Sequence, residues 1–484
     1  MSPRTRTSVA HARERDAVHP AVTIAALIER ARAAQRICET YDQTRIDELV
    51  TAAGWAIVNP EHNRRLAEVA VQDSGLGNVA DKIAKNRRKT IGLLDDLRRA
   101  RSVGVIAEIP ELGLTEIARP VGVVAAITPS TNPGATPANN IINALKGRNA
   151  IILAPSPKGQ STCVLLLEYV HAELARVSAP RDLVQQLPPP VTREATNKLM
   201  RQVDLVVATG SQTGVRAAYA SGTPAIGVGA GNVVVIVDET ADIAAAANKI
   251  AASKMFDHAT SCSSENSVIV AANAYPELLK ALEAAGGRLL EEREKEHLAA
   301  TMFAGGKLSS EFIAQSAAAI AARAGLKRAA LGSGGFLIVE ETGVGAQYPF
   351  SGEKLSPVLA LYRVADFAHA ATLAERILRY QGAGHSIGLH SAKDQRALEL
   401  GLKLPVCRVI VNQAHCFATG GAFDNGLPFS LSMGCGTWGR NSISDNLNYR
   451  HFLNITRVVR PLSSSRPEPS DAELFGAYRR KYGV

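Results

Sequence analysis

Residues 256–270 have the sequence FDHATSCSSENSVIV, in which a short polar turn joins two regular elements. An Ala-rich helical pattern precedes the turn over residues 242–255, and the apolar run after it predicts a buried strand. The turn places the thiol of Cys262 where a bound molecule can reach it. Helix termini and hydrogen-bond donors make a thiol nucleophilic by lowering its pKa. We therefore expect Cys262 to be a nucleophile, although an isolated cysteine is more commonly a small buried hydrophobic residue.

Apolar runs that predict strands alternate with helical patterns on both sides of this turn. Uniformly apolar runs are typical of strands that are buried on both faces of a parallel sheet. They lie at residues 121–127, 150–153, 205–208 and 233–237 before the turn, and at residues 267–271, 336–339, 358–362, 386–389 and 408–412 after it. The sequence therefore predicts an α/β fold of two α/β domains with parallel sheets, which divide near residue 240.

Two further features predict a small oligomerisation element. Residues 104–118 contain short apolar pieces that favour a hairpin, and residues 463–469 form a Ser/Pro-rich linker to a C-terminal tail. Ser470 and Glu473 have the spacing of a capping box, which predicts a terminal helix. The hairpin and the tail favour a homodimer or a homotetramer. We expect a flexible leader (1–20), a nucleotide-binding domain (21–240), a catalytic thiol domain (241–440), and a C-terminal return segment and tail (441–484).

The composition indicates a globular protein that acts on small molecules. Hydrophobic residues make up 46% and charged residues 20%, and no apolar run is long enough to cross a membrane. The start of the chain lacks the pattern of a signal peptide, so we expect a cytoplasmic location. The net charge is +9, but the basic residues are dispersed, which argues against a nucleic-acid partner. The six cysteines form no CxxC pair, and no cluster has the spacing of metal ligands, so we expect no metal.

Four segments stand in order along the chain: ITPSTNP (127–133), FDHATSCSSE (256–265), EKLSPV (353–358) and GCGTWG (434–439). Together they resemble the aldehyde dehydrogenase superfamily, and in particular its CoA-acylating branch. The resemblance implies an aldehyde-dehydrogenase-like fold and an enzyme that oxidises an aldehyde with a nicotinamide cofactor. In that chemistry Cys262 adds to the aldehyde, and the Asn132 amide and the Cys262 backbone N–H hold the oxyanion. An Asn before a Pro otherwise only shapes a turn.

A strand, a tight turn and the start of a helix follow one another at residues 206–212, and the N–H groups of such a helix start can bind a pyrophosphate. The Gly-rich residues 227–231 lead into a strand rather than a helix, so they do not form a dinucleotide fingerprint. The resemblance implies instead that they line the nicotinamide, with Glu353 on its ribose; an ordinary surface carboxylate is the alternative. The expected cofactor-binding residues in these segments are Ser130, Thr209, Gly210, Ser211, Gly227, Gly229 and Glu353.

Two departures from the hydrolytic members of the superfamily concern the acyl acceptor and the cofactor. Those members carry a water-activating glutamate, whereas residues 225–232 (AIGVGAGN) contain no carboxylate, which implies CoA as co-substrate. NAD-preferring relatives commonly place a glutamate against the adenine ribose, and residues 154–158 (APSPK) have none. Ser156 and Lys158 can instead bind a 2′-phosphate, which favours NADP, with NAD possible. Glu265 is either an acid/base group or a structural carboxylate.

Two segments are similar to those of acylating sulfoacetaldehyde dehydrogenases, which implies that sulfoacetaldehyde is oxidised to sulfoacetyl-CoA. A sulfonate needs cationic or N–H donors near the thiol, and His258, His415 and Arg440 are the candidates, although each can be structural. Acetaldehyde, propanal or another short aldehyde is the alternative substrate. A catalytically silent assembly protein is the alternative from a different class. The two segments are residues 260–266, and residues 412–421 with 423–429.

Overall fold

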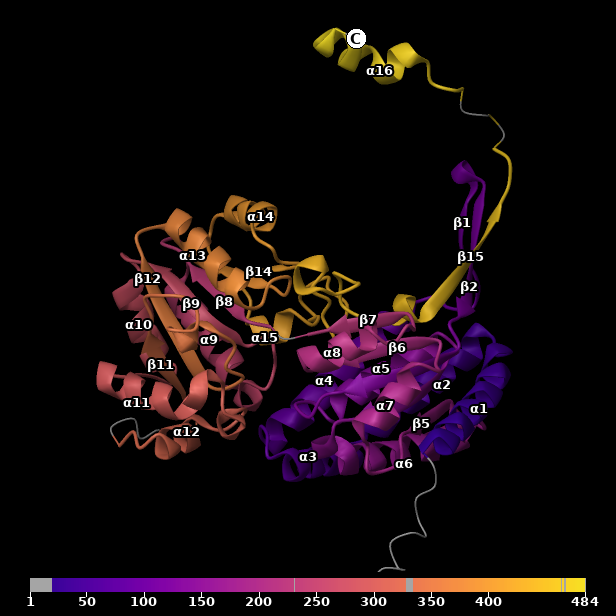
Figure 1. Cartoon of the computed structure of the whole chain (residues 1–484), viewed down its shortest axis with the longest axis horizontal. Helices are drawn as coiled ribbons and strands as arrows, with labels where there is room; N and C mark the ends of the chain where they lie inside the picture. The colour runs from indigo at the N-terminus through magenta and orange to yellow at the C-terminus, as the bar shows by residue number, and fades with distance from the viewer. Residues whose placement is uncertain (1–19, 230, 328–333, 463, 465–466, 484) are drawn as a thin grey trace, which may run out of the picture.

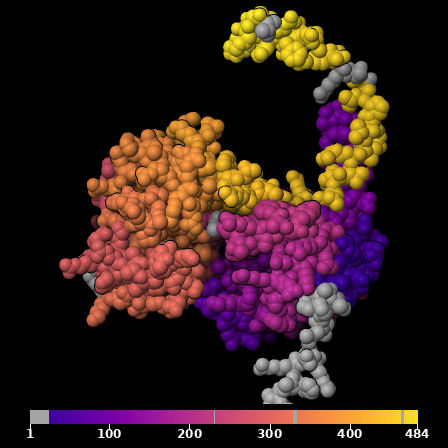
Figure 2. Space-filling model, viewed as in Figure 1, coloured from indigo at the N-terminus to yellow at the C-terminus, as the bar shows by residue number. Residues whose placement is uncertain are grey.

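The computed structural model describes residues 20–229, 231–327, 334–462, 464 and 467–483. Two lobes lie side by side, each built around a parallel sheet, and an arm of antiparallel strands projects from the first lobe (Figure 1). In the space-filling view the arm and the terminal helix stand clear of both lobes (Figure 2). The predicted α/β fold with parallel sheets is therefore confirmed. The predicted leader lies outside the described residues, apart from Pro20.

The first lobe contains a five-stranded parallel sheet in the order β5-β4-β3-β6-β7. All six residues of β4 are buried, because helices cover both faces of the sheet and leave its strands no polar side. The strands are β3 (Val123–Thr128), β4 (Ala150–Pro155), β5 (Val184–Gln186), β6 (Leu205–Thr209) and β7 (Ala225–Val228). The helices of this lobe are α1 (Pro20–Glu39), α2 (Gln43–Val58), α3 (Pro60–Ser74), α4 (Val79–Leu97), α5 (Ala135–Lys146), α6 (Gln160–Arg176), α7 (Arg193–Met200) and α8 (Gln212–Tyr219).

The direction of winding changes in the middle of this sheet. From β3 the chain moves outward through β4 to β5, whereas β6 and β7 lie on the other side of β3. The carboxyl ends of β3 and β6 therefore flank a crevice, which is where open parallel sheets bind their ligands. Asn132 follows β3, and Gly210 follows β6. The topology thus brings the predicted oxyanion donor and the predicted pyrophosphate turn to one edge of the sheet.

The second lobe contains a seven-stranded parallel sheet in the order β10-β11-β12-β9-β8-β13-β14. Alternate residues of one strand enter separate apolar cores: Val234 faces one core and Val235 the other, so both faces are buried. The strands are β8 (Val233–Val237), β9 (Glu265–Ala271), β10 (Gly287–Leu289), β11 (Phe336–Glu340), β12 (Val358–Val364), β13 (Ile387–His390) and β14 (Val409–Val411). The helices are α9 (Ile243–Met255), α10 (Tyr275–Ala284), α11 (Glu292–Met302), α12 (Ala317–Arg323), α13 (Phe367–Tyr380), α14 (Asp394–Lys403) and α15 (His415–Ala418).

The arm consists of β1 (Gly104–Ile109), β2 (Leu114–Pro120) and β15 (Leu453–Val459), which pair antiparallel in the order β1-β2-β15. The chain thus returns to the hairpin from its C-terminal end. Beyond the arm, Ser470 caps the exposed helix α16 (Asp471–Tyr482) through a capping box. The predicted linker includes residues 463, 465 and 466, which lie outside the described part of the chain.

Two features of the fold differ from the sequence prediction. Strand β8 pairs with β9 and β13, so the change of sheet falls between Val228 and Val233 rather than near residue 240. Apolar runs alone cannot show this, because neighbouring strands of the two sheets have the same pattern. Helices α3 and α4 were not predicted from the sequence. The buried face of α4 includes Lys82, Lys85 and Lys89, and a polar face hides the apolar periodicity that marks a helix.

Within the described residues, no helix has the length and apolar character needed to cross a membrane. The same part of the chain contains no group of three or more His, Cys, Asp or Glu side chains arranged to hold a metal ion.

Candidate active site

The loop before Cys262 has a strained backbone. Three consecutive residues of η4 (Phe256–Ala259), beginning with Asp257, have φ angles of 50°, 50° and 56°. Left-handed backbone is costly for residues other than glycine, so surrounding contacts must hold it. The buried carboxylate of Asp257 makes such contacts: it accepts hydrogen bonds from the backbone N–H of Asn78 at 3.0 Å and from the hydroxyl of Thr260 at 2.7 Å.

Two buried lysines of α4 complete the anchoring of this loop. Lys82 and Lys85 form ion pairs with Asp257 at 3.1 and 2.5 Å. Burial would raise the pKa of Asp257, but Lys85, Lys82 and the hydrogen bonds hold that pKa below its ordinary 3.8. Burial, with repulsion from Lys85, lowers the pKa of Lys82 to about 8. The sequence analysis missed both lysines, because a basic face on a helix is more typical of the solvent side.

Asn132 lies half-buried in the loop between β3 and α5. Its Oδ1 accepts a hydrogen bond of 2.8 Å from the ammonium of Lys85, and the same ammonium donates to the Thr260 hydroxyl at 3.0 Å. Asn132 and the loop that precedes Cys262 therefore meet at a single cation. The structure thus brings the Asn132 segment and the loop that precedes Cys262 together from opposite lobes.

The pKa of the Cys262 thiol is raised to about 12, by burial first and then by the nearby carboxyl of Glu353. This corrects the expectation that the local structure lowers the pKa of this thiol. Exclusion from water and the neighbouring carboxyl both disfavour the thiolate, and they outweigh the lowering effects of a backbone hydrogen bond and of Arg408. The thiol is therefore protonated at neutral pH, and the reaction must remove its proton.

The residues predicted to bind the cofactor phosphates lie at the carboxyl ends of the first sheet. Gly210 has a φ of 148°, and Ser211 caps the N-terminus of α8 by accepting from the Gly214 N–H at 3.2 Å. The hydroxyl of Thr209 shares a hydrogen bond of 2.7 Å with that of Ser432. Ser130 is half-buried, Ser156 has a buried hydroxyl without a hydrogen-bond partner among the described atoms, and Lys158 is exposed.

Gly227 packs against α8 so closely that a side chain would require its neighbours to shift, whereas Gly229 approaches only the end of the flexible Gln212 side chain. A Cβ atom at Gly227 would lie 2.5 Å from Val215, and one at Gly229 would lie 2.5 Å from the Gln212 amide. Glu353 accepts a hydrogen bond of 3.2 Å from the backbone N–H of Gly231. Burial raises the pKa of Glu353 to about 8, so this carboxyl is mainly protonated at pH 7.

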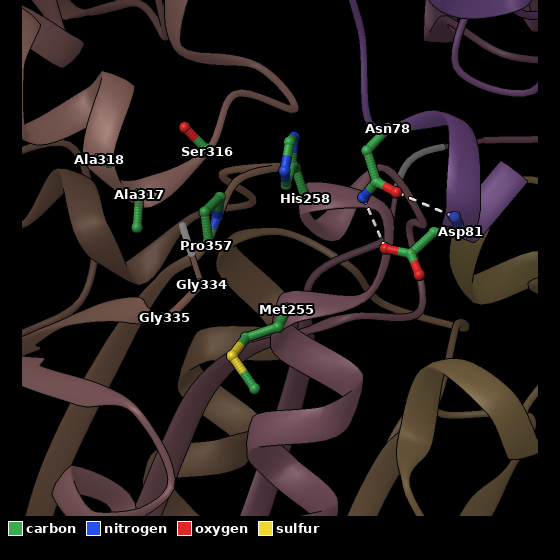
Figure 3. A pocket seen from close by; sticks show the side chains of 10 residues that line it. All are labelled: Asn78, Asp81, Met255, His258, Ser316, Ala317, Ala318, Gly334, Gly335 and Pro357. Atoms are coloured by element: carbon green, nitrogen blue, oxygen red, sulfur yellow. Dashed lines mark hydrogen bonds between the residues drawn. The ribbon is translucent and has the colours of Figure 1, made fainter. Parts of the chain in front are cut away.

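His258 lines a cavity of about 190 Å³ between the two lobes, together with Asn78, Asp81 and Met255 (Figure 3). Its Nδ1 lies 3.3 Å from the carbonyl of Ala314. Neither Cys262 nor Asn132 lines this cavity. His258 thus contributes to a cavity that the thiol does not line, although it precedes Cys262 by only four positions in sequence.

His415 does not provide the cation that the sequence analysis expected. It is buried, and its Nδ1 lies 2.9 Å from the Ser263 carbonyl and 2.9 Å from the Thr419 hydroxyl. Burial lowers its pKa to about 4, so the ring is neutral at pH 7 and cannot form an ion pair with a sulfonate. Arg440 is exposed at the end of the turn Thr437–Gly439.

The sequence analysis also missed His385, which is buried beside the thiol loop. A Cβ atom placed on Gly231 would lie 2.4 Å from the Cys262 carbonyl and 3.1 Å from His385 Cδ2. The Nδ1 of His385 bonds the Ser386 hydroxyl at 2.7 Å, and its Nε2 has no described partner. Burial, with repulsion from Arg408, lowers its pKa to about 3. At neutral pH this imidazole is therefore uncharged, and a pKa this low makes it a weak base.

The structure favours the structural role for Glu265. This first residue of β9 is buried, and its Oε1 accepts a hydrogen bond of 3.1 Å from the backbone N–H of His415. The ammonium of Lys254 donates to the Glu265 carbonyl at 2.7 Å. The bond to His415 joins the start of β9 to the start of α15, and burial raises the pKa of the Glu265 carboxyl to about 7.

Two parallel sheets, with a helix N-terminus at the edge of the first and a cysteine on a loop of the second lobe that contacts the first, fit the architecture of an NAD(P)-dependent oxidoreductase with a cysteine nucleophile. The chain belongs to the aldehyde dehydrogenase family, whose profile matches residues 1–321. It is 60% identical over 463 residues to the acylating sulfoacetaldehyde dehydrogenase of Cupriavidus necator, which covers 96% of this chain and 94% of that protein. The sequence prediction of an acylating aldehyde dehydrogenase is confirmed.

Solved structures agree with this assignment. An acetylating aldehyde dehydrogenase from Geobacillus thermoglucosidasius superposes with a TM-score of 0.88 at 36% identity, covering 93% of this chain and 98% of that one. An engineered glycolyl-CoA reductase with bound NADP+ has a TM-score of 0.80 at 25% identity, covering 90% and 96%. A Rhodopseudomonas palustris propionaldehyde dehydrogenase with bound propionyl-CoA has a TM-score of 0.80 at 26% identity, covering 92% and 96%.

Proposed function

We propose that this protein oxidises sulfoacetaldehyde with NADP and CoA to sulfoacetyl-CoA, through a thioester on Cys262. The observation that carries the proposal is the similarity, over nearly the whole chain, to an acylating sulfoacetaldehyde dehydrogenase. The positions of Cys262 and Asn132 on facing loops support it, because a donor that stabilises the oxyanion must lie next to the thiol that forms the adduct.

In the proposed reaction, residues of this chain carry the attack on the aldehyde and the stabilisation of its adduct, and the two bound molecules take the hydride and the acyl group. Cys262 Sγ attacks the aldehyde carbon, and the proton of this half-buried thiol is released to solvent. The Asn132 NH2 group and the Cys262 N–H stabilise the resulting alkoxide, and one such donor lowers a barrier by about 2.7–4 kcal/mol. Bound NADP supplies the hydride acceptor. The remaining thioester on Cys262 is attacked by the thiol of CoA, which releases sulfoacetyl-CoA and regenerates the cysteine.

The absence of a water-activating carboxylate supports CoA as the acyl acceptor. Residues 225–232 contain no Asp or Glu, and the nearby carboxyl of Glu265 is held by a backbone N–H. Glu353 is mainly protonated at pH 7 and is a poor base. A thioester on Cys262 is therefore protected from hydrolysis until another thiol arrives.

The first lobe fits a nicotinamide dinucleotide that carries a 2′-phosphate. The N-terminus of α8 and the backbone of Gly210 can bind the pyrophosphate. The unpaired buried hydroxyl of Ser156 and the exposed ammonium of Lys158 lie together after β4, where the adenine ribose of such a cofactor would extend. We propose NADP as the preferred cofactor for this reason.

Arg88 is a further candidate for the sulfonate. Its guanidinium lies 5.1 Å from the ring centroid of Phe417, which packs at 4.8 Å against Phe256 of the thiol loop. Among described atoms Arg88 donates only to the Phe417 carbonyl, at 3.2 Å, so further N–H groups remain for an anion. We expect Arg88→Met to lower kcat/KM for sulfoacetaldehyde much more than for acetaldehyde, with Arg440→Met as the matched comparison. An equal loss of kcat/KM for both aldehydes would mean that Arg88 does not bind the sulfonate.

The test of the function is initial-rate reduction of NADP with sulfoacetaldehyde, with and without CoA, repeated with acetaldehyde and with NAD. We expect a rate that requires CoA, sulfoacetyl-CoA as the product, and a preference for the sulfonate. A rate that ignores CoA and yields free acid would overturn the acyl transfer. If CoA is required but acetaldehyde is preferred, the substrate is instead a plain short aldehyde.

We also propose a homodimer or homotetramer in the cytoplasm. All six cysteines are unpaired thiols, which fits a reducing compartment. β15 is an edge strand of the arm, and its Val458 and Val459 are exposed, so it offers a surface to a second copy. Size-exclusion chromatography with light scattering tests the oligomer, and a monomer at micromolar concentration would contradict it.

A further inference from the structure

Lys85 makes three hydrogen bonds in the buried space between the lobes. Its ammonium donates to Asn132 Oδ1 at 2.8 Å, to Asp257 Oδ2 at 2.5 Å and to Thr260 Oγ1 at 3.0 Å. An ammonium has three N–H donors, so each one has an acceptor. The side chain is 7% exposed, and it therefore serves these three partners rather than solvent or a substrate.

The neighbouring lysines of α4 do not make the same contact. Lys82, one turn earlier, donates to Asp257 Oδ2 at 3.1 Å and to the Thr131 carbonyl at 3.4 Å. Lys89, one turn later, donates to the carbonyls of Gly420 and Gly421. Of these three buried cations, Lys85 alone touches the amide of Asn132.

This contact determines which way the Asn132 amide faces. An ammonium can only donate a hydrogen bond, so the atom next to Lys85 must be the carbonyl oxygen of the amide. The NH2 group then points to the opposite side and has no acceptor among the described residues. Withdrawal of electron density toward the cation also makes the NH2 group a stronger donor, and the effect is large where water is excluded.

The geometry points to Lys85 as a positioning residue for the reaction. We propose that Lys85, itself held by Asp257, fixes the Asn132 amide with its NH2 group toward the oxygen of the aldehyde that Cys262 attacks. This inference rests on the proposed function in so far as Asn132 is the oxyanion donor. One ammonium thereby sets the distance between the loop that carries the nucleophile and the donor that stabilises its adduct.

The contact also joins the two lobes at the reacting centre. Lys85 and Asn132 belong to the first lobe, whereas Asp257 and Thr260 belong to the thiol loop of the second. A shift of one lobe relative to the other would therefore break either the amide contact or the loop contact. The alignment of nucleophile and oxyanion donor is thus sensitive to how the lobes pack.

The test compares Lys85→Met with Lys82→Met. Both variants remove one ion pair of Asp257, but only the first removes the partner of Asn132. We expect similar losses of thermal stability, and a kcat that is about 10- to 100-fold lower for Lys85→Met than for Lys82→Met, with little change in KM for the aldehyde. Equal losses of kcat in the two variants would assign Lys85 a merely structural role.

A double-mutant cycle tests whether Lys85 acts on kcat through Asn132 or through a general effect on the structure of the site. In the Asn132→Ala background, Lys85→Met should lower kcat by less than about threefold, because the amide to be positioned is gone. Additive losses would overturn the proposal. The cycle uses whichever aldehyde the unaltered enzyme oxidises, so a different substrate leaves it valid.

A structural readout does not depend on activity. In crystal structures of the two variants, we expect the Asn132 amide to rotate or to adopt two conformers only in Lys85→Met. An unchanged amide in that variant would overturn the positioning role even if no aldehyde were oxidised. If the proposed function is wrong but the positioning role is right, the unaltered enzyme will not oxidise the aldehyde, and the Asn132 amide will still rotate in Lys85→Met.

Discussion

The Oε1 atom of Glu353 accepts a hydrogen bond of 3.2 Å from the backbone N–H of Gly231. This contact joins the segment before β12 to the Gly-rich segment before β8. Gly231 in turn lies against the Cys262 carbonyl, where a Cβ atom would come within 2.4 Å. The carboxyl of Glu353 is therefore part of the wall around the thiol, and burial raises its pKa to about 8.

Replacing Glu353 by Gln should change how stability depends on pH. The pKa of Glu353 is about 8 in the folded protein, whereas its ordinary value is 4.5. Between these values the folded state holds a proton that the unfolded state has lost, so this group's contribution to stability is complete below about pH 4.5 and is lost as the pH rises to about 8. The unaltered protein should therefore lose thermal stability relative to Glu353→Gln between pH 5 and pH 8, measured by thermal unfolding. The same change at the exposed Glu277 is the control. A pH-independent difference would contradict the raised pKa.

Cys262 should be essential for turnover but slow to alkylate. Cys262→Ala should abolish aldehyde oxidation while NADP still binds, whereas Cys407→Ala, at a similarly half-buried thiol, should keep the activity. Because the pKa of Cys262 is about 12 rather than 9.0, its thiolate at pH 7 is about 1,000-fold scarcer than that of an ordinary cysteine. Iodoacetamide labelling, followed by mass spectrometry, should rise steadily with pH above 7. Labelling that saturates below pH 8 would show a lowered pKa instead.

Asp257→Asn should destabilise the thiol loop. The substitution removes the counter-charge of the buried Lys82 and Lys85, and breaking a buried ion pair costs about 3–5 kcal/mol. We expect a lower unfolding temperature together with a lower kcat, because the left-handed residues of the loop lose their anchor. Asp238→Asn is the control, since Asp238 is also a buried carboxylate, paired with Arg396 away from the thiol. A kcat that stays within about twofold in Asp257→Asn would argue against this role.

Lys158→Glu should shift the cofactor preference. If the exposed Lys158 binds the 2′-phosphate, reversal of its charge should raise KM for NADP by about 10- to 100-fold, since a charged hydrogen bond contributes about 1.5–3 kcal/mol. KM for NAD should change little. Initial rates with each cofactor measure the effect, and Lys280→Glu, an exposed lysine of the second lobe, controls for net charge. Parallel changes with both cofactors would mean that Lys158 does not contact the 2′-phosphate.

The sequence by itself was enough to predict the fold class and the acylating branch of the family, and it singled out Cys262 as the proposed nucleophile. Uniformly apolar strands such as β4 are detectable because burial on both faces leaves a continuous local pattern. The segments around Cys262 and Asn132 are also continuous, so each carries its own motif. The hairpin and the capping box at Ser470 are local as well, and the structure contains both.

Only the tertiary structure decided which groups act together and which of them are charged. Lys85 is 47 residues from Asn132 in sequence, and no local pattern relates them before the first lobe folds. Asp257 and Thr260 reach the same ammonium only when the two lobes pack. The neutral state of His415 and the raised pKa of Cys262 follow from burial, which depends on residues far away in the chain. Local order arises from periodicity that neighbouring residues share, whereas protonation and alignment depend on the surroundings that only the folded chain creates.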